Sequence, residues 1–152
     1  MGLQKHFTKI KRASVVCTVS GGLDSAVAAA IIADAGFALY FIFFDYGQKT
    51  CKKELRCATA LATYYRATLK VVEIGLFKNA IKCSMTEKRK LTTKYNEYVP
   101  NRNTILESQA VAYAEYLNAG AVCVGSSGGD IITPDNSLRF IYAMQSLVNI
   151  GT

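Results

Sequence analysis

The chain has 152 residues, of which 51% are apolar, and it carries 18 Lys and Arg against 11 Asp and Glu, for a formal net charge of +7. This length suits a single domain over residues 1–152, with residues 1–12 as a basic N-terminal extension. No run of about 18 apolar residues occurs, which argues against a membrane-spanning helix. The N-terminus resembles a secretory signal only superficially, because no small-residue cleavage pattern follows its apolar run.

Five cysteines are scattered along the chain, and none belongs to a Cys-x-x-Cys pair. An odd, scattered set predicts reduced thiols in a cytoplasmic protein and no self-contained zinc site. Cys17 and Cys123 lie in apolar, strand-like runs, which favours a role as small buried hydrophobes.

The positive charge raises nucleic acid as a partner. Much of the charge lies in two stretches, residues 5–12 and 78–94, and the second has no regular spacing. A solvated loop is the interpretation that we favour for the second stretch. A pocket for a triphosphate would also benefit from a positive field, so nucleic acid stays an open but less favoured partner.

Strand-like and helix-like segments alternate along the chain. Short apolar runs rich in β-branched and aromatic residues predict four buried strands, at residues 13–19, 38–44, 69–74 and 121–125. Helical patterns predict helices at residues 23–35, 50–66, 103–117 and 137–148, and Gly36 is placed to end the first of them. At the start of the third helix, Thr104 and Glu107 fit a capping box.

This alternation predicts an α/β fold, a doubly wound, Rossmann-like parallel sheet with helices on both faces. Such sheets bind their ligands at the carboxyl ends of the strands. Polar residues follow three of the predicted strands directly, in segments 20–25, 45–49 and 126–136. We therefore expect the functional site where these three segments meet.

The segment between the first strand and the first helix predicts a phosphate-binding loop; its residues are Ser20, Gly21, Gly22, Leu23, Asp24 and Ser25. The two glycines allow a tight turn and a close approach to a ligand, and the helix N-terminus offers free N–H groups to an anion. The serines add hydroxyl donors, and Asp24 beside phosphates makes sense chiefly with Mg²⁺ between them. An ordinary turn capped by Asp24 or Ser25 is the alternative. The loop is not a Walker loop, because the Lys of that motif is missing. It is not a dinucleotide-binding fingerprint either, because the third glycine of that motif is missing.

This hexapeptide resembles the PP-loop of enzymes that cleave ATP between its α- and β-phosphates, which have an adenine nucleotide alpha hydrolase-like fold. The resemblance implies that all six residues contact ATP and that pyrophosphate is released. It also implies that a substrate oxygen is adenylated before a nucleophile, often ammonia, displaces AMP. A carboxylate needs such activation because it has no viable leaving group.

Further stretches resemble one family of PP-loop enzymes, the 7-cyano-7-deazaguanine (preQ0) synthases. They are Phe-Asp-Tyr-Gly-Gln-Lys at 44–49 with Lys-Glu-Leu at 53–55, Tyr-Val-Pro-Asn-Arg-Asn-Thr-Ile at 98–105, Val-Gly and Pro-Asp within 124–135, and Asn-Ile-Gly-Thr at 149–152. The resemblance implies an ATP- and Mg²⁺-dependent carbon–nitrogen ligase that converts 7-carboxy-7-deazaguanine and ammonia to the nitrile preQ0, a precursor of queuosine and archaeosine. It also implies a bound Zn²⁺ and pairing with a second copy or a partner subunit.

The resemblance assigns roles to individual residues. It implies ATP contacts beyond the PP-loop at Phe44, Asp45, Gln48 and Asn103. Catalytic roles fall to Asp24, Lys49 and Arg102, with Asp24 also as the metal ligand. Substrate contacts fall to Tyr46, Arg102, Gly125, Asp130 and Asp135, where the two aspartates would accept hydrogen bonds from the N–H edge of the guanine-like ring.

Each of these roles has a structural alternative that the sequence leaves open. Phe44 also suits the core, Tyr46 a turn, and Arg102 the surface. Asn103 also suits a helix N-cap, and Asp135 in Pro-Asp-Asn is a turn signal by itself.

The chain also departs from the family pattern. It lacks the family's later strand, helix and zinc-binding cysteine cluster, and segment 130–136 is one residue shorter than usual. We therefore expect either a partner chain that completes the site or a shortened relative with another substrate. The functional alternatives are a PP-loop enzyme that adenylates another carboxylate or tRNA, and a non-catalytic ATP-binding protein.

Overall fold

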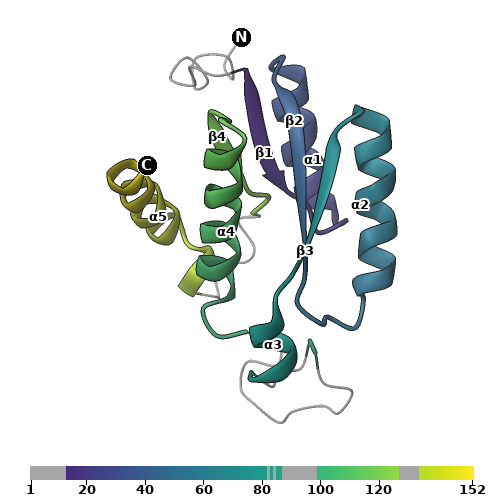
Figure 1. Cartoon of the computed structure of the whole chain (residues 1–152), viewed down its shortest axis with the longest axis vertical. Helices are drawn as coiled ribbons and strands as arrows, with labels where there is room; N and C mark the ends of the chain where they lie inside the picture. The colour runs from purple at the N-terminus through teal and green to yellow at the C-terminus, as the bar shows by residue number, and fades with distance from the viewer. Residues whose placement is uncertain (1–12, 82, 84, 87–98, 127–133) are drawn as a thin grey trace.

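The protein is described from a computed structural model that places residues 13–81, 83, 85–86, 99–126 and 134–152. Four strands form one parallel sheet, β1 (Ser14–Thr18), β2 (Ala38–Asp45), β3 (Thr68–Glu73) and β4 (Ala121–Cys123), in the order β3-β2-β1-β4 (Figure 1). Val16 of β1 pairs with Tyr40 of β2 on one side and with Val122 of β4 on the other. The predicted Rossmann-like parallel sheet is confirmed.

Alternate residues of the strands bury two separate cores, as the pleat of a sheet requires. One face packs against α1 (Leu23–Asp34) and α2 (Cys51–Tyr65) through side chains such as Cys17, Phe41 and Phe43. The other face packs against α3 (Gly75–Asn79) and α4 (Arg102–Tyr116) through side chains such as Val16 and Ile42. Figure 1 shows these helices on opposite sides of the sheet, which confirms the doubly wound arrangement.

The helix α3 is the element that the sequence patterns do not predict. It has five residues, too few for a helical period to be recognised, and it follows β3 directly. Its Phe77 is buried in the same core as Val16, and its Lys78 points back toward the end of β2. The basic stretch thus begins with an ordered turn of helix, whereas most of residues 78–94 and all of 1–12 lie outside the described residues.

The capping-box prediction for α4 is wrong. The helix begins at Arg102, with Asn101 as the preceding residue in a left-handed conformation (φ 54°), so Thr104 stands inside the first turn. The Thr104 hydroxyl donates to Asn101 Oδ1 at 2.7 Å, and Glu107 is not engaged with the N-cap. The hydrogen-bond acceptor for the Asn103 amide in the first turn of α4 comes from another segment of the chain.

The last helix, α5 (Leu138–Gly151), packs on the short 3₁₀ turn η3 (Pro134–Asn136) and lies away from the sheet (Figure 1). Ser137 caps it by accepting a hydrogen bond from the Phe140 amide at 3.2 Å. Tyr142 and Ile150 are 70% and 86% exposed on its outer surface. Among the described residues, no helix combines the length and apolar character that a bilayer crossing requires.

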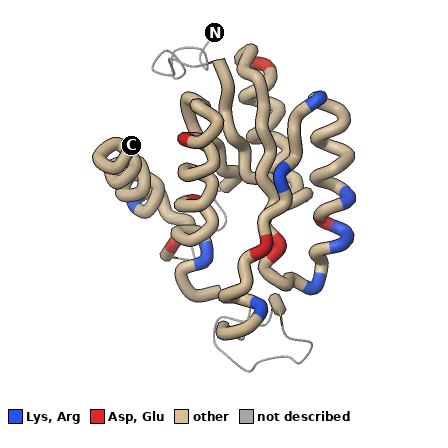
Figure 2. The backbone as a smooth tube through the Cα atoms, in the orientation of Figure 1, with Lys and Arg blue, Asp and Glu red and all other residues tan. Residues whose placement is uncertain are grey.

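Charged residues of the described segments are distributed unevenly, as Figure 2 shows. Lys52, Lys53 and Arg56 lie on the exposed side of α2, away from its buried Ala58 and Ala62. The start of α2 itself lies against the loop after β1, because a Cβ at Gly21 would meet the carbonyl oxygen of Glu54. Nucleic acid stays a prediction, less favoured as a partner.

Candidate nucleotide-binding and active site

The candidate site lies where the strand order reverses. The chain passes from β1 to β2 on one side and reaches β4 on the other, so the strand order reverses between β1 and β4, the place where such sheets bind ligands. A cavity of about 360 Å³ opens there. Its lining comes from the segments after β1, β2 and β4 and from one side of α4, and includes Thr18, Ser20, Ser25, Phe44, Tyr46, Gln48, Glu54, Arg102, Asn103, Glu107, Gly125, Ser126 and Asn136.

The loop after β1 has a glycine-dependent backbone. Gly21 has φ +72°, and a Cβ at this position would overlap with the carbonyl oxygen of Glu54 in α2. The two serines hold the turn together: Ser25 Oγ donates to Gly22 O at 3.0 Å and accepts from the Ser20 amide at 3.3 Å. Ser20 Oγ in turn accepts from the Gly22 amide at 3.3 Å. The conformation is therefore fixed by the loop itself before any ligand binds.

The N-terminus of α1 opens at this loop without a side-chain cap. Its N-cap residue is Gly22, and no side chain accepts from its first amides. These N–H groups have no partner within the helix, so together with the positive end of the helix dipole they favour an anion. Asp24, in the first turn, is exposed beside them. An ordinary turn capped by Asp24 or Ser25, the alternative left open by the sequence, does not explain why the N-terminus of α1 lacks a side-chain cap.

Gly125 brings the loop after β4 against the phosphate loop. A Cβ at Gly125 would lie 2.6 Å from the backbone nitrogen and Cα of Ser25, so the two backbones are in direct contact. The loops after β1 and β4 therefore form one wall of the cavity. A side chain at position 125 would have to displace the start of α1.

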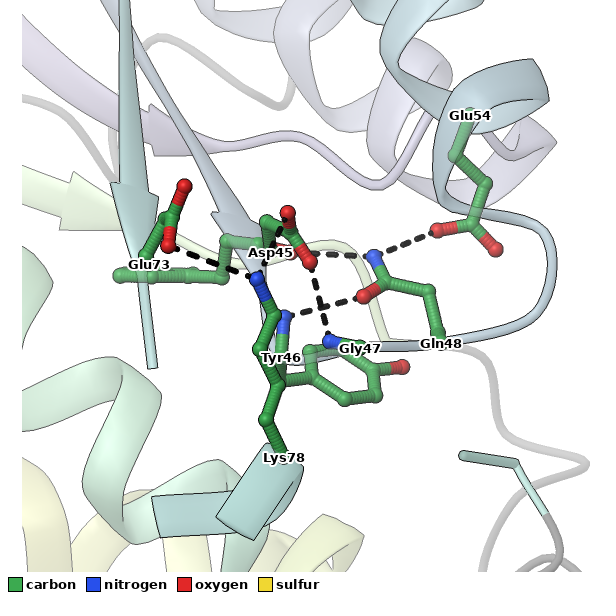
Figure 3. A network of polar contacts seen from close by, with 8 residues as sticks. Asp45, Tyr46, Gly47, Gln48, Glu54, Glu73 and Lys78 are labelled. Carbon is green, nitrogen blue, oxygen red and sulfur yellow. Dashed lines mark hydrogen bonds and ion pairs between the residues drawn. The ribbon is translucent and has the colours of Figure 1, made fainter. Parts of the chain in front are cut away.

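Gln48 organises the loop after β2 (Figure 3). Its Nε2 donates to Phe44 O and to Glu54 Oε2, both at 3.0 Å, and its Oε1 accepts from the Tyr46 amide at 3.0 Å. The side chain is 4% exposed. Gln48 thus ties the end of β2 to α2 and fixes Tyr46, and its side-chain amide is engaged within the protein; its contact with ATP stays a prediction.

Asp45 is also engaged within the protein (Figure 3). Its carboxylate accepts from the Gly47 amide at 2.9 Å and pairs with Lys78 Nζ at 3.0 Å, and Lys78 also reaches Glu73 at 3.5 Å. Burial opposes ionisation of Asp45, but the Gly47 amide and the Lys78 ammonium outweigh it and hold the pKa of Asp45 below its usual value. The hydrogen bond to Asp45 raises the pKa of Lys78 in return.

Arg102 is oriented inside the cavity by three neighbours. Its guanidinium carbon lies 5.7 Å from the centroid of the Tyr46 ring, and Nη1 lies 3.4 Å from the Tyr46 hydroxyl and 3.3 Å from Met85 Sδ. Nε donates to Asn103 Oδ1 at 3.3 Å. None of these partners is charged, so the guanidinium charge is available to an anion. Burial against these groups raises the pKa of Tyr46.

Asp135 of η3 holds the first turn of α4. Its Oδ2 accepts from the Asn103 amide at 3.1 Å, and its carbonyl oxygen accepts from Asn103 Nδ2 at 2.8 Å. Asp135 is 8% exposed. A residue 32 positions away in sequence therefore supplies the acceptor that a local N-cap would give. This position gives Asp135 a structural role within the site.

Glu107 is a cavity residue that the sequence analysis assigned only to a capping box. It lies one turn after Asn103 on α4 and lines the cavity. Burial, and then the nearby charge of Asp135, raise the pKa of Glu107 from 4.5 to about 7. The helical pattern places Glu107 on the surface of α4. No sequence pattern therefore identifies it as a site residue.

The structure gathers eight of the predicted site residues around the cavity, namely Ser20, Ser25, Phe44, Tyr46, Gln48, Arg102, Asn103 and Gly125. Gly21, Gly22, Leu23 and Asp24 form the turn and the start of α1 at its edge. Lys49 is exposed and outside the lining, with its amide bonded to Met85 O at 2.9 Å. Asp130 lies outside the described residues.

The described cysteines do not form a metal centre. Cys17 and Cys123 are register neighbours on β1 and β4, and the hydrogen bond that the Cys17 thiol donates to Cys123, with burial, raises the pKa of Cys17. Cys51, Cys57 and Cys83 are also free thiols. Within the described ranges, no group of three or more His, Cys, Asp or Glu side chains could hold a metal ion, so these residues do not fit a zinc site.

Solved structures with the same fold include a synthetase and a tRNA thiolase. An NH3-dependent NAD synthetase from Campylobacter jejuni superposes with a TM-score of 0.55 at 23% identity, over 78% of this chain and 50% of that one. The U34-tRNA thiolase NcsA from Methanococcus maripaludis superposes with a TM-score of 0.56 at 14% identity, over 82% and 43%. At these identities the similarity supports the Rossmann-like fold alone.

Sequence comparison is more specific. The 7-cyano-7-deazaguanine synthase of Methanococcus aeolicus is 35% identical over 154 residues, covering 90% of this chain and 66% of the relative. The synthase of Picrophilus torridus is 36% identical over 148 residues, covering 90% and 61%. The chain thus spans a little under two thirds of the length of these curated relatives. The family model described as "Queuosine biosynthesis protein QueC" matches residues 14–152, and the chain therefore belongs to the QueC family.

Proposed function

We propose that the chain uses ATP to activate the carboxylate of 7-carboxy-7-deazaguanine for conversion by ammonia to 7-cyano-7-deazaguanine. The observation that carries the proposal is the uncapped N-terminus of α1 at a glycine turn, facing a cavity that contains Arg102. This is an anion site beside a cation, as a nucleotide with a carboxylate substrate requires. The relatives named 7-cyano-7-deazaguanine synthase supply the substrate class.

The residues of the loop fit the phosphates of ATP. Gly21 lets the loop pack against α2, Gly125 lets the loop after β4 pack against the start of α1, and Ser20 and Ser25 border the cavity. The free amides at the start of α1 would hold the β- and γ-phosphates, which leave together as pyrophosphate. In this role Phe44 and Tyr46 line the space open to the base.

Mg²⁺ would bind with Asp24 as its protein ligand. One carboxylate is enough, because Mg²⁺ completes its octahedron with phosphate oxygens and water. When bound, the ion would neutralise charge on the phosphates and favour departure of pyrophosphate.

The proposed reaction proceeds by two activations. A carboxylate oxygen attacks the α-phosphorus and pyrophosphate leaves; ammonia then displaces AMP to give the amide. The amide oxygen attacks the α-phosphorus of a second ATP and pyrophosphate leaves again; loss of AMP and of both protons of the amide nitrogen then gives the nitrile. Arg102 would bind the carboxylate and the charge that develops on the phosphate. We keep a catalytic role for the exposed Lys49, and pairing with a second copy, as predictions.

Pyrophosphate release from ATP, with and without 7-carboxy-7-deazaguanine and ammonium, tests this proposal. We expect substrate-stimulated release from the wild-type chain and its loss in Asp24→Ala. Asp34→Ala, which removes an exposed aspartate at the other end of α1, is the matched control and should keep the stimulation. ATP binding without stimulated release would refute synthase activity for this chain, and stimulation by another carboxylate or by tRNA would reassign the substrate.

A further inference from the structure

The cavity contains a carboxylate that the proposed chemistry does not use. Glu107 lines it from α4, on the side formed by η3 and the loop after β4, where Ser126, Asn136 and Asn103 also lie. Within the described part of the chain, no hydrogen bond or ion pair engages the Glu107 side chain. The other acid of this region, Asp135, is committed to the Asn103 amide.

Among the described residues, no cation pairs with Glu107. The described titratable groups that face it or share the cavity are Asp135 of η3, Arg102 of α4, Tyr46 after β2 and Glu54 of α2. Asp135 is the charge that acts on Glu107, and it is of the same sign. Arg102 interacts instead with Tyr46 and Met85. A half-buried carboxylate in this position gains most from N–H donors that a ligand brings.

We propose that Glu107 is the specificity residue that accepts hydrogen bonds from a ligand's planar N–H edge, the ring N–H and exocyclic amino group of a guanine-like base. The inference rests on the proposed function, since a deazaguanine presents this pair of donors side by side. A carboxylate can accept both at once, as it does from a guanidinium. The aspartates predicted for this task are Asp135, which is engaged as a cap, and Asp130, which lies outside the described residues.

Two groups whose ionised forms have opposite charge line the cavity from α4. Arg102 contacts Tyr46 and Met85, whereas Glu107 lies within the influence of Asp135. A deazaguanine carboxylate has its negative group on the five-membered ring and its donor edge on the six-membered ring. Binding with the carboxylate toward Arg102 and the phosphate loop would turn the donor edge toward Glu107.

Equilibrium binding to the full chain tests the inference, with two ligands and three proteins. The ligands are 7-carboxy-7-deazaguanine and its analogue without the 2-amino group; the proteins are wild type, Glu107→Gln and Glu115→Gln. Glu115 is an exposed glutamate on the same helix, so its change removes the same charge away from the cavity. Circular dichroism spectra confirm that each variant is folded, and ATP affinity is measured in parallel.

We expect Glu107→Gln to weaken binding of the deazaguanine by about tenfold to a hundredfold, as loss of hydrogen bonds to a charged group does. Its effect on the analogue should be under about threefold, because that ligand lacks one of the two donors. ATP affinity and the Glu115→Gln variant should match the wild type. Wild-type affinity for the deazaguanine should also rise from pH 6 to pH 8, and this rise should vanish in Glu107→Gln.

The outcomes separate the two proposals. Equal weakening of both ligands, no weakening, or a loss confined to ATP would overturn the role of Glu107 while leaving the proposed function in place. Failure of the wild-type chain to bind the deazaguanine, with ATP binding intact, would overturn the proposed substrate and with it this inference.

Discussion

Replacement of Glu107 by Gln should stabilise the unliganded protein, and the gain should grow with pH. The folded-state pKa of Glu107 is raised from 4.5 to about 7, chiefly by burial and then by the charge of Asp135. A raised carboxyl pKa favours the folded state at low pH, and this advantage is lost as the pH rises from about 4.5 to about 7. Glutamine has the same shape and no proton to lose, so it avoids the cost at higher pH.

The full rise in the pKa of Glu107, from 4.5 to about 7, corresponds to a loss of at most about 3 kcal/mol in the free energy of unfolding. Because Glu107 is only half-buried, water screens part of the cost, and we expect a gain of about 1 kcal/mol at pH 8. For a chain of this length that is a rise in Tm of about 2–4 °C. At pH 5 the gain should be close to zero.

Thermal unfolding of the wild type, Glu107→Gln and Glu115→Gln at pH 5, 6, 7 and 8 measures this effect. The Glu115 variant reports what removal of an exposed charge does on the same helix. A Glu107→Gln gain that is the same at pH 5 and pH 8, or no larger than that of Glu115→Gln, would refute the reasoning from burial.

Two further substitutions test the contacts that shape the cavity. Gly125→Ala should destabilise the fold by about 1–3 kcal/mol and weaken ATP binding, because its Cβ would lie 2.6 Å from the Ser25 backbone; denaturant unfolding and ATP titration measure this. Gly151→Ala, which meets no atom within 4 Å, is the control, and equal stability of the two variants would contradict the contact. Asp135→Ala should cost about 1–2 kcal/mol by removing the acceptor of the Asn103 amide. It should also lower the pKa of Glu107, followed by NMR of the carboxyl carbon; an unchanged pKa would show that Asp135 does not act on it.

The local parts of the fold follow from sequence patterns. Apolar runs rich in β-branched residues identify β1 and β2, because parallel strands are buried on both faces. The two glycines of Ser-Gly-Gly-Leu-Asp-Ser predict the tight turn after β1, where Gly21 has a φ of +72° and no room for a Cβ. The position of the site at the carboxyl ends of the strands follows from the strand–helix alternation alone.

The parts that could not be predicted depend on contacts between distant segments. The short helix α3 gives no period to recognise, yet its Lys78 pairs with Asp45 at 3.0 Å and, after the Gly47 amide, helps to hold the pKa of Asp45 below its usual value. The Thr104 and Glu107 pattern suggests a capping box, but Asp135 supplies the acceptor from 32 residues away. A local pattern cannot show that a stronger acceptor reaches the same amide from another part of the chain.

Asp135 connects the stability of the site to its electrostatics. By accepting from Asn103 it fixes the first turn of α4, and Asn103 in turn accepts from Arg102 Nε. Burial, and then the charge of this same carboxylate, raise the pKa of Glu107 one turn later. The group that orders the guanidinium thus makes the neighbouring carboxylate costly to ionise. A ligand that brings an anion to Arg102 and N–H donors to Glu107 would relieve that cost, and a ligand with only one of these features would not. Selectivity between deazapurine carboxylates and other carboxylates would then arise from this pair of charges on α4.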